Sequence, residues 1–276
     1  MGKVISVWGS PNTGKTTLSI KLAKELSKEC TVMLVFTDLI SPVIPTIFKE
    51  ADKDKTLGNV LSAPSLTEEV ILKNSISIKG NKNLGIIGYK EYDNVFTYPQ
   101  FSKERAIEFI QKIRAFSDYI ILDLSSFFVN DMLSTTALEI SDEIIRVSSP
   151  SLKDISYYDS YLPLINTADY SLEHHINVIS MFRENDAVEE LAELYNAEER
   201  IPYMDELREQ SMCGDLFNSL SSKNEQKIKN IIDNLMYIID YEENEADETE
   251  CLSASLVKEN GKKGLFSKFN FRKREA

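Results

Sequence analysis

The sequence of 276 residues has few cysteines, no long apolar run and no excess of basic residues, and each shortage excludes a class of protein. Its three cysteines, Cys30, Cys213 and Cys251, form neither a C-x-x-C pair nor the even set of a disulfide framework. We therefore expect ordinary thiols in a reducing cytoplasm. No stretch approaches about 18 consecutive apolar residues, and the N-terminus lacks a charged and apolar leader. We expect neither a membrane span nor a secretion signal.

Acidic residues outnumber basic ones by 44 to 31, so the formal net charge is −13. This charge repels nucleic acid and weighs against broad, non-specific DNA binding, although a local basic patch stays open as an alternative. With 42% hydrophobic residues, the chain can bury the core of one large α/β domain, with or without appendages.

One stretch carries a strong chemical signal, because residues 9–17 fit the phosphate-loop pattern G-x-x-x-x-G-K-[ST]. In such a loop the glycines let backbone N–H groups point at phosphates, the lysine reaches the β- and γ-oxygens, and the next hydroxyl ligates Mg²⁺. The apolar run 3–8 predicts a buried strand before the loop, and a helix is predicted from about residue 16. We thus predict a nucleotide site formed by Gly9, Ser10, Pro11, Asn12, Thr13, Gly14, Lys15, Thr16 and Thr17.

Two carboxylates follow apolar runs of strand length. Asp38 comes after the run 31–36, and Asp123 ends the run 119–123. Continuous apolarity predicts strands of a parallel sheet that are buried on both faces, and ligands bind at the carboxyl edge of such a sheet. Asp123 could there hold the water shell of Mg²⁺; the alternative is a carboxylate that merely ends its strand.

Other segments predict further elements of the same α/β fold. His174 and His175 precede a predicted strand, and without a third ligand at suitable spacing we interpret them as surface residues of a loop rather than metal ligands. Residues 50–58 are polar and predict a loop. Apolar runs predict strands at 84–89, 143–148 and 176–180, and apolar periodicity predicts helices at 57–61, 66–72, 103–116, 187–195 and 222–240.

The composition changes sharply after residue 240. Residues 241–257 are acidic and predict a solvated linker, and residues 258–276 mix basic and aromatic residues. Such a segment suits an anionic membrane surface or the groove of a protein partner. The alternative is a flexible C-terminal tail that is disordered or folds back on the acidic body.

Together these motifs resemble the MinD/ParA family of dimerising ATPases over nearly all of residues 1–240. The similarity rests on the Gly-Lys-Thr-Thr end of the phosphate loop, the strands before Asp38 and Asp123, the segment 141–150 and the Ile-Pro-Tyr stretch from residue 201. The resemblance implies a three-layer P-loop NTPase domain with a mostly parallel sheet, ATP and Mg²⁺ as ligands, and an ATP-dependent homodimer. The short form is similar to the pilus-positioning members TadZ and CpaE.

The resemblance also implies roles for single residues. Lys15 would neutralise the β- and γ-phosphates, and Asp38 would orient the attacking water, which makes these two the catalytic residues. Thr16 and Asp123 would hold Mg²⁺ and its waters. Thr17 would bind the α-phosphate, and Pro202 would lie near the adenine.

Four departures from the family's pattern lower the expected rate of hydrolysis. Ser10 stands where the family has its signature lysine, and Phe36 replaces the first acidic residue of its switch strand. Residues 124–126 replace its proline-containing stretch, and Ser180 or Met181 occupies the place of its adenine-contacting asparagine. A cation facing the transferred phosphoryl group stabilises developing charge, so its loss predicts slow turnover.

Three alternatives to a slow, cytoplasmic or membrane-peripheral ATPase switch for positioning or assembly remain. The first is a scaffold locked by ATP without hydrolysis. The second is DNA segregation of the ParA type, against which the acidic charge weighs. The third, a small-molecule kinase or ligase, has no evident acceptor-site motif.

Overall fold

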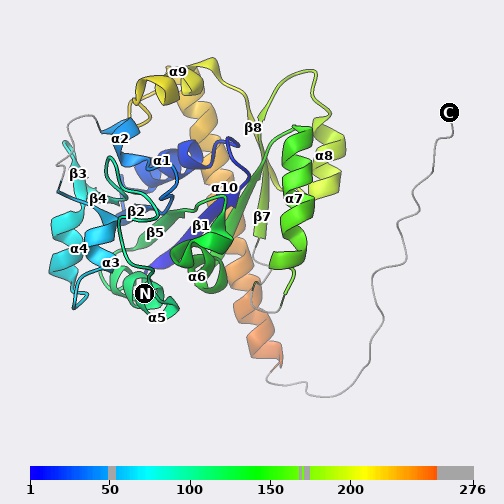
Figure 1. Cartoon of the computed structure of the whole chain (residues 1–276). Coiled ribbons are helices and arrows are strands. Elements are labelled where there is room, and N and C mark those ends of the chain that lie inside the picture. Colours follow the sequence, from blue (N-terminus) through cyan, green and yellow to red (C-terminus); the bar gives the residue numbers. More distant parts are fainter. Residues whose placement is uncertain (49–53, 168–169, 171–174, 254–276) are drawn as a thin grey trace. The chain divides into compact units, whose positions relative to one another are not determined.

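The computed structural model describes residues 1–48, 54–167, 170 and 175–253 (Figure 1). The chain divides into two units, residues 1–235 and residues 236–276. The predicted tail at 258–276 and His174 lie outside the described residues. No helix in the described part of the chain is both long and apolar enough to cross a bilayer.

The first unit is built on an eight-stranded sheet with the order β3-β4-β2-β5-β1-β6-β7-β8. Neighbouring strands run parallel except for the antiparallel pair β3 and β4. The strands are β1 (Lys3–Gly9), β2 (Val32–Phe36), β3 (Ile76–Ile78), β4 (Asn81–Ile87), β5 (Tyr119–Asp123), β6 (Glu143–Ser148), β7 (His175–Phe182) and β8 (Glu199–Pro202).

Helices lie on both faces of this sheet and complete three layers (Figure 1). α1 packs on β1, β2 and β5 from one face, and α5 packs on β5 from the other, where it also contacts α6. The helices are α1 (Lys15–Leu26), α2 (Ile44–Ile47), α3 (Leu57–Leu61), α4 (Glu68–Asn74), α5 (Lys103–Arg114), the 3-10 turn η1 (Phe128–Asn130), α6 (Met132–Ile140), α7 (Leu152–Ile165), α8 (Val188–Tyr195), α9 (Asp205–Cys213) and α10 (Ser222–Ser253).

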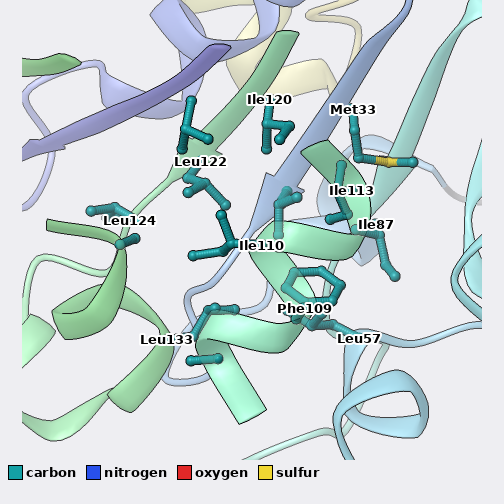
Figure 2. Close-up of a cluster of buried hydrophobic side chains, with 14 of the residues drawn as sticks. Met33, Leu57, Ile87, Phe109, Ile110, Ile113, Ile120, Leu122, Leu124 and Leu133 are labelled. Carbon is teal, nitrogen blue, oxygen red and sulfur yellow. The ribbon is translucent and has the colours of Figure 1, made fainter. Parts of the chain in front are cut away.

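The core forms where the apolar stripe of α5 meets the sheet. Phe109, Ile110 and Ile113 are fully buried and belong to one cluster with Ile120 and Leu122 of β5 (Figure 2). Burying such a side chain stabilises the fold by about 1.5–3 kcal/mol. This packing fixes β5, at whose end Asp123 lies.

The predicted α/β fold is therefore correct, with strands β5 and β6 at the predicted bounds. Residues 54–56 form a loop as predicted, while 49–53 lie outside the described residues. Cys30 and Cys213 are free thiols, as expected.

Two sequence interpretations are wrong. His175 is buried in the strand β7, not exposed in a loop, because β7 begins one residue earlier than predicted and pairs with Ile144 there. The helix expected to end at residue 240 continues to Ser253, so the acidic stretch 242–250 is helical. Glutamate and alanine favour helices, which explains the extension.

Candidate functional site

The phosphate loop curls tightly between β1 and α1, and glycine is required at both of its ends. A Cβ atom on Gly9 would lie 2.0 Å from the carbonyl oxygen of Val147 in β6. Gly14 caps the N-terminus of α1 with a left-handed φ of 86°. Only glycine enters this region without strain, so the loop takes the shape that its pattern predicts.

Lys15 is buried at the start of α1 with its ammonium group held inside the loop. Its Nζ donates to the Ser10 carbonyl oxygen at 2.8 Å and to the Ser126 hydroxyl at 2.7 Å. Burial lowers the pKa of Lys15, and the charges of Asp123, Asp38 and Asp154 oppose that shift. The ammonium group is thus bonded to two neutral oxygens, and charged phosphate oxygens would be stronger partners for it.

Thr16 and Asp123 lie together, as predicted. The Thr16 hydroxyl donates to Asp123 Oδ2 at 2.6 Å, and the Ser19 hydroxyl donates to Oδ1 at 3.2 Å. Burial raises the pKa of Asp123 to about 6, against the hydrogen bond from Thr16 and the charge of Lys15. A hydroxyl beside one carboxylate fits Mg²⁺, which prefers oxygen ligands and shares them with waters and phosphates rather than a full protein cage.

Asp38 lines the same site, just beyond β2. Its Oδ1 accepts hydrogen bonds from the backbone N–H of Ile40 at 2.9 Å and of Ser41 at 3.2 Å. Phe36, two residues earlier, is only 1% exposed and packs in the core. Asp38 is therefore the acidic group that β2 brings to the site.

These groups line one cavity of about 590 Å³, a volume typical of small-molecule sites. Its wall also contains apolar side chains, among them Met181, Met204 and Met212. Nine of the predicted residues border it, whereas Gly9, Ser10 and Thr13 shape the loop behind it. The nine are Pro11, Asn12, Gly14, Lys15, Thr16, Thr17, Asp38, Asp123 and Pro202.

The structure also explains the side chains that depart from the family's pattern. The Ser10 hydroxyl donates to Asp154 at the start of α7, and Asp154 also accepts from the Ser149 backbone N–H at 2.6 Å. Burial raises the pKa of Asp154. The Ser180 hydroxyl donates to the Thr13 carbonyl, so it fixes the phosphate loop, while Met181 stands in the cavity wall.

Sequence reasoning did not assign Ser126 or Asp154 to the site. Ser126 was visible only as part of the altered stretch after Asp123, and Asp154 gave no signal because it precedes no recognisable motif. Both reach the loop from segments that follow β5 and β6 along the chain.

Comparison with solved structures identifies the architecture. A plasmid partition protein of Borrelia burgdorferi B31 bound to AMPPNP matches with a TM-score of 0.67 and 19% identity, covering 86% of this chain and 99% of its own. The septum site-determining protein MinD of Pyrococcus horikoshii OT3 with Mg-ADP matches with a TM-score of 0.68 and 20% identity. This match covers 85% of this chain and 96% of the MinD chain. A chain of a MinC:MinD cell division complex of Aquifex aeolicus matches with a TM-score of 0.67 and 19% identity. This match covers 85% of this chain and 96% of that chain.

No protein-family model matches the sequence, and no curated protein is similar at a meaningful level. At identities near one fifth, a structural match establishes the fold, and here it does so over most of the described chain. The resemblance inferred from the motifs is thus confirmed at the level of architecture. This chain has the P-loop NTPase fold of the MinD, ParA and McdA ATPases.

Proposed function

We propose that this protein binds ATP·Mg²⁺ and acts as a nucleotide-gated dimeric switch in intracellular positioning or assembly, with slow hydrolysis. One observation carries the proposal: Lys15 and the Thr16–Asp123 pair line the same cavity as a group of apolar side chains, among them Met204 and Met212. The charged and hydroxyl groups suit phosphates and a metal ion, and the apolar side chains suit a base.

The positions of the side chains support the roles that the resemblance implies. Lys15 would exchange its bonds to Ser10 and Ser126 for the β- and γ-phosphates, and Thr16 with Asp123 would hold Mg²⁺. Asp38, which lines the cavity, would orient the attacking water. When bound, Mg²⁺ supplies positive charge to the phosphate oxygens.

Closure of two protomers over the nucleotides is the gating step that we propose. Ser10 offers no cation to a partner's phosphates, and its hydroxyl is already bonded to Asp154. Without that cation the charge that develops on the transferred group is less stabilised, which favours slow turnover.

The experiment measures phosphate release from ATP·Mg²⁺ at several protein concentrations. We expect a rate per protomer that rises with concentration, as a dimer-gated site requires, and that disappears in Lys15→Ala. Lys28→Ala is the matched control, because Lys28 lies beyond α1 and pairs with Glu25 at 2.5 Å outside the cavity. Release that is equal in the wild type and Lys15→Ala would reject an ATPase at this site.

A second candidate is a scaffold that ATP locks without hydrolysis. The burial of Phe36 favours it, because that position offers an apolar ring in place of a carboxylate. In this case ATP would bind and no phosphate above the Lys15→Ala background would be released. DNA segregation of the ParA type is a weaker candidate, since the chain carries a net charge of −13.

We also propose that the chain works in the cytoplasm, with the basic tail 258–276 bringing it to an anionic membrane surface or a protein partner. Two tails in a dimer would bind where one is too weak, so ATP would control recruitment through avidity. In this organisation residues 1–240 are the ATPase domain and 241–257 connect it to the tail.

A further inference from the structure

Ser126 links the phosphate loop to helix α7 through two different atoms. Its hydroxyl accepts a hydrogen bond from Lys15 Nζ at 2.7 Å. Its backbone carbonyl accepts a hydrogen bond from the Tyr157 hydroxyl. The side chain therefore lies at the lysine that reaches for phosphates, while its backbone is held from outside the loop.

The Ser126 side chain is placed to respond to a ligand. It is 6% exposed and borders the nucleotide cavity. A serine hydroxyl both accepts and donates, so it can accept from an ammonium group or donate to a phosphate oxygen. A phosphate oxygen bound by Lys15 lies one hydrogen bond from Nζ, within reach of a rotation of this hydroxyl.

Tyr157 is held firmly enough to fix the backbone of Ser126. Its ring stacks on Tyr161 with centroids 4.4 Å apart and lies 6.1 Å from the ring of Trp8. Burial raises the pKa of Tyr157, so its hydroxyl keeps the proton that it donates at neutral pH. The start of α7 is anchored as well, since Asp154 accepts from Ser10 and from Ser149.

We infer that Ser126 contacts the terminal phosphate of the nucleotide and that Tyr157 is the positioning residue that holds it there. The inference rests on the proposed function, because it concerns the same nucleotide site. Without nucleotide, the Ser126 hydroxyl accepts from Lys15. With a γ-phosphate present, Lys15 binds that group and the hydroxyl turns to donate to one of its oxygens.

This arrangement distinguishes ATP from ADP. ADP has no γ-phosphate, so the Ser126 hydroxyl has no γ-phosphate oxygen to bind and gains nothing. A hydrogen bond to a charged group changes affinity by roughly tenfold or more, which sets the size of the effect. Tyr157 acts through Ser126, so removing its hydroxyl costs part of the same preference.

The experiment measures dissociation constants of the full chain for Mg²⁺-AMPPNP and Mg²⁺-ADP. Ser126→Ala removes the hydroxyl, Ser126→Thr restores one, and Tyr157→Phe removes only the phenolic oxygen. Ser125→Ala is one matched control, because the Ser125 hydroxyl accepts from the Phe127 backbone N–H and does not line the cavity. Tyr161→Phe is the second, since its hydroxyl bonds to no described residue.

We expect the preference for AMPPNP over ADP to fall about tenfold in Ser126→Ala and about threefold to tenfold in Tyr157→Phe. Ser126→Thr should regain most of it, and both controls should stay within about twofold of the wild type. ADP affinity should change little in every variant, which shows that the site still folds.

The remaining outcomes separate this inference from the proposed function. If the wild type binds both nucleotides and Ser126→Ala keeps its preference, or if the variant weakens both equally, Ser126 does not read the terminal phosphate and the proposed function stands. If the wild type binds neither nucleotide, or Lys15→Ala binds as the wild type does, the proposed function fails and this inference fails with it.

Discussion

Ser10 shows how one side chain sets the chemistry that the site can perform. It occupies the place of the signature lysine in the family that the sequence resembles, and its hydroxyl donates to the buried Asp154. Replacing Ser10 therefore tests whether a missing cation limits hydrolysis.

We expect Ser10→Lys to raise phosphate release per protomer at least about tenfold, because it would bring a cation to the transferred phosphoryl group. Ser10→Ala removes the bond to Asp154 without adding charge and should leave the rate near that of the wild type. The measurement is steady-state phosphate release at a protein concentration that saturates dimerisation. An unchanged rate in Ser10→Lys would show that another step limits turnover.

Asp38→Asn tests the proposed water-orienting carboxylate. The amide oxygen can still accept from the Ile40 and Ser41 backbone N–H groups, so the loop keeps its bonds while the charge is lost. We expect phosphate release to fall about a hundredfold and ATP affinity to stay within about threefold. Equal release by the variant and the wild type would remove Asp38 from the mechanism.

At the residue scale, the sequence predicts what is local and misses what is distant. Lys15 and Thr16 are fixed by a pattern of consecutive residues, and Asp123 by the strand that it ends. Ser126 is 111 positions from Lys15, and Asp154 is 144 positions from Ser10. No local pattern marks such partners, because the order of strands in the sheet brings them together.

Helix α6 begins at a carboxylate that ties it to the ends of β2 and β5. Asp131 accepts from the backbone N–H groups of Leu133 and Ser134, both at 3.2 Å. The Ser134 hydroxyl lies 2.7 Å from the Thr37 hydroxyl just beyond β2, and it accepts from the Ser125 backbone N–H at 3.2 Å. Burial raises the pKa of Asp131 to about 6, helped by the charge of Asp38.

This pKa predicts a pH dependence of stability. The folded state holds the Asp131 proton more tightly than the unfolded chain, so the stabilisation is complete below about pH 4 and is lost as the pH rises to about 6. Asp131→Asn keeps a good helix cap and removes the titration. Between pH 4 and 6, the free energy of unfolding of the wild type should fall by on the order of 2 kcal/mol relative to the variant. Denaturant unfolding of both proteins checks this, and parallel curves would contradict it.

At the element scale, prediction succeeded where burial dictates composition. β5 and β6 are continuous apolar runs and were placed at their observed bounds. Helix α7 was not predicted, because its serines, tyrosines and internal Pro163 give no clear apolar stripe. Helix α6 was not predicted either, because serine and threonine residues interrupt its apolar residues. The Ile-Pro-Tyr stretch begins inside β8 and precedes α9, and its signal concerned a ligand rather than an element.

At the scale of the whole molecule, charge is divided unevenly along the chain. The chain has a net charge of −13, yet its last nineteen positions, 258–276, concentrate lysine and arginine among aromatic residues. This segment lies outside the described residues. An acidic body is repelled by anionic surfaces, so any attraction to them would depend on the tail.

Truncation before Lys258 should therefore abolish recruitment to vesicles that contain anionic lipid, measured by co-sedimentation with AMPPNP and Mg²⁺ at low salt. The full chain should bind and should be released as the salt concentration rises, because screening weakens the attraction. Vesicles of neutral lipid are the control. Recruitment that survives truncation would rule out the tail as the membrane anchor.

The central claim is that a terminal phosphate controls association of two protomers. The most direct test is the particle mass of the full chain by light scattering with Mg²⁺-AMPPNP, Mg²⁺-ADP or no nucleotide. We predict twice the monomer mass with AMPPNP alone, and the monomer mass under every condition for Lys15→Ala. A monomer in the presence of bound AMPPNP, or a dimer whose mass ignores the nucleotide, would contradict the claim.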